Sequence, residues 1–200
     1  MQRFTQIVGA GCLLWATGAT AGVHVTVQDP TGRALPDAVV FLESPTAARQ
    51  ARPMTGVEMA QANKAFVPQV LPVTRGTAVH FPNRDTVRHH VYSFSAIKPF
   101  ELKLYIGTPA NPVLFEQTGV AVLGCNIHDH MVGWVLVLDT PYFQRSDAQG
   151  VARLPQAPPD RYRLRVWHPR LPVGAAAHSQ PLLLGDTAQT VTVQLRGLEP

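Results

Sequence analysis

The residues best suited to chemistry lie in one short segment that contains Cys125, His128 and Met131. A thiolate, an imidazole and a thioether follow one another at intervals of three residues, between two apolar stretches. About forty residues upstream, His89 and His90 follow another strand-like stretch. Thiolate and thioether sulfurs suit Cu(I), while imidazole suits both oxidation states of copper. Cysteine with two histidines and a weak axial methionine is therefore the ligand set of a blue-copper electron-transfer site.

The same region leaves other metal sites open. His130 lies inside the cysteine-containing loop and His90 adjoins His89, so four histidines could gather at one face. Either extra imidazole could replace Met131 as a ligand or bind a second ion. Zinc is also chemically allowed, although the methionine argues against it. The ligands of such a zinc site would be Cys125, His89, His128 and His130.

The N-terminal residues 1–21 have the features of a secretory signal peptide. Arg3 supplies the positive charge, an apolar stretch covers residues 7–16, and Ala19-Thr20-Ala21 is a small-x-small cleavage site. The apolar stretch is shorter than the ~20 residues that a membrane span needs. We therefore expect a periplasmic chain that starts near Gly22 and has no stable membrane insertion after cleavage.

Cleavage would leave Cys125 as the single cysteine, because Cys12 departs with the leader. A lipoprotein attached through Cys12 is a weaker alternative, since the apolar region before it would be very short. A lone thiol in an oxidising compartment is exposed to oxidation or mispairing unless something occupies it. A bound metal is the usual occupant.

The composition favours a β protein and excludes several function classes. The chain has 200 residues, of which 46% are hydrophobic and 15% charged, with 18 Pro and 15 Gly. This apolar content is too high for disorder, and the recurring turn formers disfavour a helical bundle. A net charge of +4 is too small to indicate nucleic acid as a partner. No phosphate-binding loop or nucleophile signature is present, so we expect no enzyme.

Short alternating segments at intervals of ~8–12 residues predict an all-β sandwich or barrel. Pro68 and Pro72 interrupt one of them, which suits an edge strand. Residues 44–63 lack a period and predict a long loop or short helix. We expect strands at residues 24–28, 38–42, 66–73, 78–81, 91–94, 100–104, 113–115, 119–123, 134–138, 150–154, 162–167 and 190–195.

Residues 66–139 resemble a cupredoxin domain. The spacing Cys125-x-x-His128-x-x-Met131 is that of amicyanin-type copper sites. Upstream, residues 79–91 resemble the strand, turn and His-Asn-Val segment of the family. This resemblance implies a Greek-key β-sandwich that holds one copper ion, cycling between Cu(II) and Cu(I).

The resemblance to that family implies a role for each ligand. Aligned on the upstream segment, the first histidine of the family falls on His89, and His90 occupies the place where Asn is common. The resemblance thus implies two histidines and the cysteine as equatorial ligands and the methionine as the axial one. These are His89, Cys125, His128 and Met131, with His90 and His130 as less certain members.

The whole chain also resembles periplasmic cupredoxin-containing proteins often labelled "methylamine utilization protein", through residues 89–94, 124–129 and 139–143. His130 stands where that family often has an aromatic residue. Residues 25–42 and 147–169 resemble a carboxypeptidase-regulatory or transthyretin-like β-sandwich. The expected organisation is a smaller sandwich interrupted by the copper domain. Its parts are a signal peptide (1–21), a first sandwich part with linker (22–61), the cupredoxin domain (62–140) and the rest of the sandwich (141–200).

Three functions compete for this organisation. The first is a one-electron carrier that docks redox partner proteins transiently, since outer-sphere transfer needs no substrate pocket. The second is a copper-handling or delivery protein, because the extra imidazoles of His90 and His130 would make an open, exchangeable site. The third is a structural or assembly module that merely retains the loop.

Overall fold

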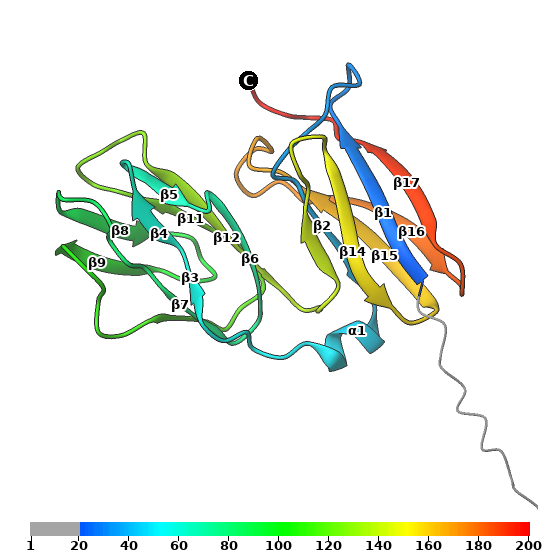
Figure 1. Cartoon of the computed structure of the whole chain (residues 1–200), viewed down its shortest axis with the longest axis horizontal. Helices are drawn as coiled ribbons and strands as arrows, with labels where there is room; N and C mark the ends of the chain where they lie inside the picture. Colours follow the sequence, from blue (N-terminus) through cyan, green and yellow to red (C-terminus); the bar gives the residue numbers. More distant parts are fainter. Residues whose placement is uncertain (1–20) are drawn as a thin grey trace, which may run out of the picture.

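The computed structural model describes residues 21–200, which fold into two β-sheet lobes lying side by side (Figure 1). These residues form seventeen strands and one short helix, so the prediction of an all-β fold is confirmed. The predicted signal peptide lies outside the described residues, apart from Ala21 at the start of the first strand. Among the described helices, none combines the length and the apolar character of a membrane span.

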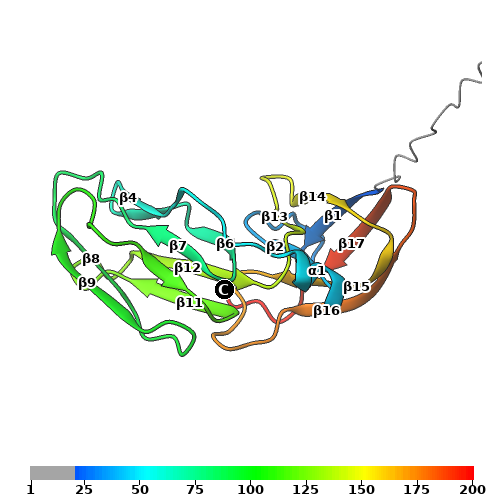
Figure 2. The same ribbon diagram turned by 90° about the horizontal axis from the view of Figure 1, so that it is seen from below.

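The first lobe is built from both ends of the described chain (Figure 2). Val23, Val25 and Val27 alternate along its first strand and are fully buried, which is the period-2 pattern of a strand with one face in a core. One sheet has the order β14 (Val151–Ala157), β1 (Ala21–Gln28) and β17 (Gln189–Gln194). The other has the order β13 (Phe143–Arg145), β2 (Val39–Glu43), β15 (Asp160–Trp167) and β16 (His178–Leu184).

The second lobe is formed by the middle of the chain. Its core contains Phe66, Phe81 and Phe115 together with Cys125 and Met131. The larger sheet has the order β6 (Val70–Thr74), β12 (Val132–Leu138), β11 (Gly119–Gly124), β8 (His89–Ser93) and β9 (Phe100–Tyr105). A smaller sheet has the order β10 (Val113–Phe115), β7 (Thr77–His80) and β3 (Val57–Glu58). A hairpin adds β4 (Ala60–Ala62) and β5 (Ala65–Val67).

Two crossings connect the lobes. The chain leaves the first lobe after β2 through helix α1 (Pro45–Gln50), whose N-cap is Ser44; the Ser44 hydroxyl accepts a hydrogen bond from the Ala47 amide. It returns after β12, where the hydroxyl of Tyr142 donates to Gln50 in that helix. The second lobe is therefore an insertion between β2 and β13 of the first.

A glycine in a tight turn gives the first lobe a position at which a side chain cannot fit. Gly150 has φ +74°, and a Cβ there would lie 2.5 Å from the carbonyl oxygen of Val27. We expect Gly150→Ala to lower the free energy of unfolding by about 1–3 kcal/mol, measured by thermal denaturation, because the backbone must move or remain strained. Gly185→Ala is the matched control, since a Cβ there meets nothing within 4 Å. Equal effects of the two substitutions would contradict the prediction.

Candidate metal centre

Three side chains of the second lobe bring their ligand atoms to one point. The donor atoms of His89, Cys125 and His128 all lie within 4.8 Å of one another. The Sγ of Cys125 is 3.9 Å from Nδ1 of His89 and 3.7 Å from Nδ1 of His128. An ion held at typical metal–sulfur and metal–imidazole distances, with angles between tetrahedral and trigonal, separates sulfur and nitrogen by about 3.6–3.8 Å. The arrangement therefore fits one small metal ion between the three atoms.

The sheet fixes the two chain segments that carry these ligands. His89 is the first residue of β8, and Cys125 directly follows β11. Gly124, immediately before the cysteine, is paired with Tyr92 of β8 and with Val132 of β12. Because both ligand segments belong to adjacent strands of one sheet, their separation is held by the backbone ladder rather than by flexible loops.

A tight turn closes the loop after the cysteine. The amide of Met131 donates to the carbonyl of His128 over 2.9 Å, and the amide of Val132 donates to that of His130 over 3.1 Å. These bonds return the chain to β12, which begins seven residues after Cys125. The turn thus presents the second histidine beside the thiol without a long mobile segment.

A partly buried carboxylate orients the first histidine. The His89 side chain is fully buried, and its Nε2 lies 2.7 Å from Oδ2 of Asp85. Asp85 also accepts hydrogen bonds from the backbone amides of Asn63 and Lys64. The Lys64 amide is the largest influence that lowers the pKa of Asp85 below its usual value, so the group is a carboxylate near neutral pH. It therefore fixes the proton on Nε2 and leaves the Nδ1 lone pair facing the cysteine, as in carboxylate–histidine–metal arrangements.

Asn83 holds the loop that carries this carboxylate. Its Nδ2 donates to the carbonyls of Val87 and Tyr105, each over 2.8 Å, and its Oδ1 accepts from the amide of Asp85. The side chain is buried and makes three bonds, so the loop between β7 and β8 has one defined geometry. Asn83 and Asp85 were not predicted as site residues. The sequence does place the carboxylate of Asp85 four positions before His89, but this spacing is not characteristic of an orienting residue.

Replacement of the orienting carboxylate tests this arrangement. We expect Asp85→Asn to weaken copper binding by roughly 10–100-fold, because loss of a partner to a metal-bound histidine typically has this effect. A competition titration against a copper chelator measures it. Asp129→Asn is the matched control, since Asp129 lies exposed in the ligand loop. Unchanged affinity in Asp85→Asn would show that the carboxylate does not orient a ligand.

The second histidine is held close to the first. The imidazole rings of His128 and His89 have centroids 4.9 Å apart. Burial lowers the pKa of His128 below its ordinary value, and the neighbouring His89 lowers it further. Metals bind the neutral form of imidazole, so this environment favours the ligating state.

The remaining predicted ligands lie in different surroundings. Met131 is buried in the same hydrophobic cluster as Cys125. The Nε2 of His90 is 2.8 Å from Oε1 of Glu101, and its ring centroid is 5.6 Å from that of Tyr92. His130 is exposed, with its ring 6.1 Å from that of His128. The structure thus brings together three of the six predicted residues, keeps Met131 in the adjoining core and places the extra histidines outside the cluster.

A partly buried tyrosine supports the loop beneath the site. The hydroxyl of Tyr105 donates to the carbonyl of Phe81 over 2.6 Å and is also bonded to Gln61. Burial raises the pKa of Tyr105 to about 12, so the phenol stays protonated as a donor. Tyr105 is the register partner of His89 in the sheet. His89 is therefore flanked by the Asp85 loop on one side and by Tyr105 of β9 on the other.

Comparison with known proteins gives partial structural likenesses. No protein-family model matches the chain. No curated protein matches it either. It is similar to a purple cupredoxin from Nitrosopumilus maritimus at 23% identity, over 41% of this chain and 99% of that one, with a TM-score of 0.37. A mutant of amicyanin in its reduced Cu(I) form is similar at 23% identity over 51% of this chain and 99% of that one, with a TM-score of 0.39.

A copper-containing nitrite reductase from Thermus scotoductus is a third such structure. The identity is 23% and the TM-score 0.39. The match covers 48% of this chain and 27% of the reductase. In all three comparisons the similar region is about half of the present chain or less.

Proposed function

We propose that this chain is an exported, cupredoxin-type copper protein that carries single electrons between partner proteins. The observation that carries the proposal is the convergence of a buried thiol and two imidazole Nδ1 atoms, with S···N distances of 3.7 and 3.9 Å. Copper bound there would supply a couple between Cu(II) and Cu(I), one electron apart. The chain would accept that electron from a reduced partner and give it to an oxidised one.

The surroundings of the ligands support the role of an electron carrier. His89 is held by Asp85, and both ligand segments are paired into one sheet, so the ligand positions change little between oxidation states. A site that needs little rearrangement transfers electrons with a small barrier. Voltammetry of the copper-loaded protein tests the proposal. We expect a reversible one-electron wave with copper retained in both states; loss of copper on reduction would contradict it.

The buried methionine is proposed as the axial ligand. Met131 lies in the same cluster as Cys125 and directly precedes β12. A thioether donor stabilises Cu(II), so we expect Met131→Leu to retain copper and to raise the reduction potential, measured by the same voltammetry. An unchanged potential would instead indicate that another group, such as His130, fills the axial position.

Copper delivery is the second candidate function. The observation that favours it is the exposed imidazole of His130, 6.1 Å from that of His128, at the surface of the same loop. Such a group would receive a copper ion leaving the site. Transfer to a chelator separates the candidates: a carrier releases copper slowly, whereas a delivery protein releases it quickly and slows when His130→Ala removes the surface ligand.

We also propose that the chain is exported and binds its partner proteins only transiently. Residues 1–21 would direct the chain to the periplasm, where redox partners or copper-handling proteins would be met. N-terminal sequencing of the secreted protein checks this step. We expect a start near Gly22, and an intact N-terminus in the periplasmic fraction would contradict cleavage.

A further inference from the structure

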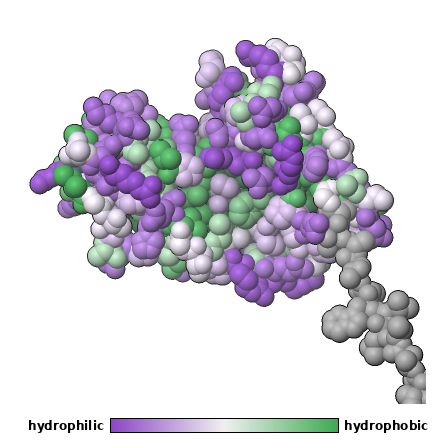
Figure 3. All heavy atoms as spheres, in the orientation of Figure 1, coloured by the Kyte–Doolittle hydropathy of each residue, from purple (hydrophilic) through white to green (hydrophobic). Residues whose placement is uncertain are grey.

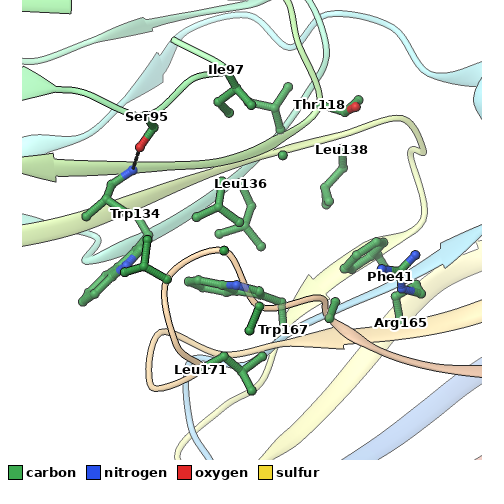
Figure 4. Close-up of a pocket in the computed structure, with 18 of the residues that line it drawn as sticks. Phe41, Ser95, Ile97, Thr118, Trp134, Leu136, Leu138, Arg165, Trp167 and Leu171 are labelled. Atoms are coloured by element: carbon green, nitrogen blue, oxygen red, sulfur yellow. Dashed lines mark hydrogen bonds between the residues drawn. The ribbon is translucent and has the colours of Figure 1, made fainter. Parts of the chain in front are cut away.

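A hydrophobic groove lies between the two lobes, away from the metal ligands. Its volume is about 550 Å³, within the range of pockets that bind small molecules. Trp134 and Leu136 of β12 form one wall, and Phe41 of β2 and Trp167 of β15 form the other (Figure 4). Hydrophobic atoms are visible where the lobes meet (Figure 3). The groove therefore offers an apolar compartment that copper chemistry does not use.

The aromatic walls leave hydrogen-bond donors available. The rings of Trp134 and Trp167 have centroids 6.5 Å apart. Within residues 21–200, neither indole N–H has a hydrogen-bond partner. Neither indole nitrogen is among the fully buried unpaired atoms of the described residues, so both N–H groups are accessible and could donate to a ligand with acceptor atoms.

One end of the groove carries a guanidinium with unused donors. Arg165 lies over the ring of Phe41, 5.8 Å from its centroid, and donates from Nη1 to Glu43 over 2.9 Å. Its Nε–H is buried without a partner. The side chain is 24% exposed, so a small movement would aim its free N–H groups at an incoming acceptor. Arginine presents a planar fork of donors that matches a carboxylate.

Positive charge continues from this end along the sheet. Arg161, Arg163 and Arg165 alternate on β15 and so share one face. Among their register partners on β2 and β16, Glu43 is the single carboxylate, which leaves positive charge in surplus. Two carboxylates also line the groove, and both are paired. Glu43 contacts Arg165 at 2.9 Å, and Asp139 contacts Arg75 at 3.3 Å. The apolar compartment therefore opens toward a region that attracts anions.

We propose that this groove binds a small amphipathic carboxylate, with its apolar body between Trp134 and Trp167 and its carboxylate at Arg165. The apolar walls exclude a fully polar anion, and the surplus arginines favour an anion over a neutral molecule of the same shape. This site is separate from the copper function and does not depend on it. It would let a carboxylate ligand bridge both lobes and so limit their relative movement.

Calorimetric titration of the full chain with decanoate and with decan-1-ol tests the proposal. We expect one decanoate per chain, bound at least about tenfold more tightly than the alcohol, because a hydrogen bond to a charged group contributes more than one to a neutral group. Arg165→Met removes the charge and should lower the decanoate affinity by a similar factor while leaving the alcohol unaffected. Arg153→Met is the matched control, since Arg153 is paired with Asp147 on the other sheet.

A second variant locates the ligand. Ala175 lines the groove, and Ala175→Trp would fill part of it and weaken both ligands. The absence of decanoate binding, equal affinity for acid and alcohol, or an equal loss in Arg153→Met would overturn the proposal. Unchanged decanoate affinity in Ala175→Trp would overturn it as well, because the ligand would then lie elsewhere.

Discussion

Replacing Cys125 with serine is expected to abolish the intense visible absorption of the copper-loaded protein. That absorption comes from charge transfer between a thiolate and Cu(II), and Cys125 is the free cysteine of the described chain. We also expect copper affinity to fall by more than the roughly 10–100-fold that loss of an orienting partner costs. Absorption spectroscopy and chelator competition measure the two effects.

The neighbouring Asn126 supplies a control for this substitution. Asn126 is exposed and adjoins the cysteine in the same loop. Asn126→Ala should keep both the absorption and the affinity, because it contributes no ligand. If the absorption survived in Cys125→Ser, the thiol would not be a copper ligand and the site would have to be reassigned.

Replacing Phe66 with alanine is expected to lower the free energy of unfolding by about 3–5 kcal/mol, the usual effect of removing a buried aromatic ring. Phe66 is almost fully buried in the core of the second lobe. Its ring lies against Gly133 of β12, where a Cβ would come within 3.0 Å of it. The cavity would therefore loosen the strand that follows Met131, and copper binding should weaken too. Chemical denaturation and copper titration measure these effects.

The adjacent residue of β5 provides the control. Val67 is 50% exposed, so Val67→Ala should change the stability by less than about 0.5 kcal/mol. A comparable loss in both variants would contradict the view that Phe66 acts through the core. Loss of stability in Phe66→Ala with unchanged copper affinity would show that β12 holds its position without the ring.

Much of the fold could be predicted from alternation in the sequence. The alternating valines of β1 and the alternation through Leu164 and Val166 in β15 bury one face each, and the structure has strands there. The segment interrupted by Pro68 and Pro72 forms two strands of different sheets, β5 and β6, and β6 lies at a sheet edge as predicted. Within residues 44–63, the prediction of a loop or short helix is confirmed for α1, whereas β3 and β4 in the same range were not predicted.

The strands that were missed have physical reasons. β3, β4 and β13 are two or three residues long, too short for a period to show. β16 contains Pro181 and forms the sheet edge beside β15, and only two of its seven residues are buried. Whether such segments form strands depends on hydrogen-bonded pairing with a neighbouring strand, rather than on the pattern of their own residues.

Some residues of the candidate site could likewise be predicted from the sequence, and others could not. Cys125 and His128 could be predicted because they share one loop, and His89 because it resembles a known ligand segment. Asp85 could not, since its role depends on the amides of the distant β4–β5 turn at Asn63 and Lys64. The groove could not be predicted either, because its walls come from strands of two separate lobes. Contacts between residues that are far apart in the sequence produce no recognisable spacing of residue types.

The visible absorption spectrum of the secreted protein, loaded with Cu(II), shows whether the thiolate and the two imidazoles hold copper together. A thiolate and two imidazoles around Cu(II), at the positions of Cys125, His89 and His128, should give an intense band at about 600 nm. We expect this band, with one copper per chain. A colourless protein that binds copper weakly, or that prefers zinc, would contradict it.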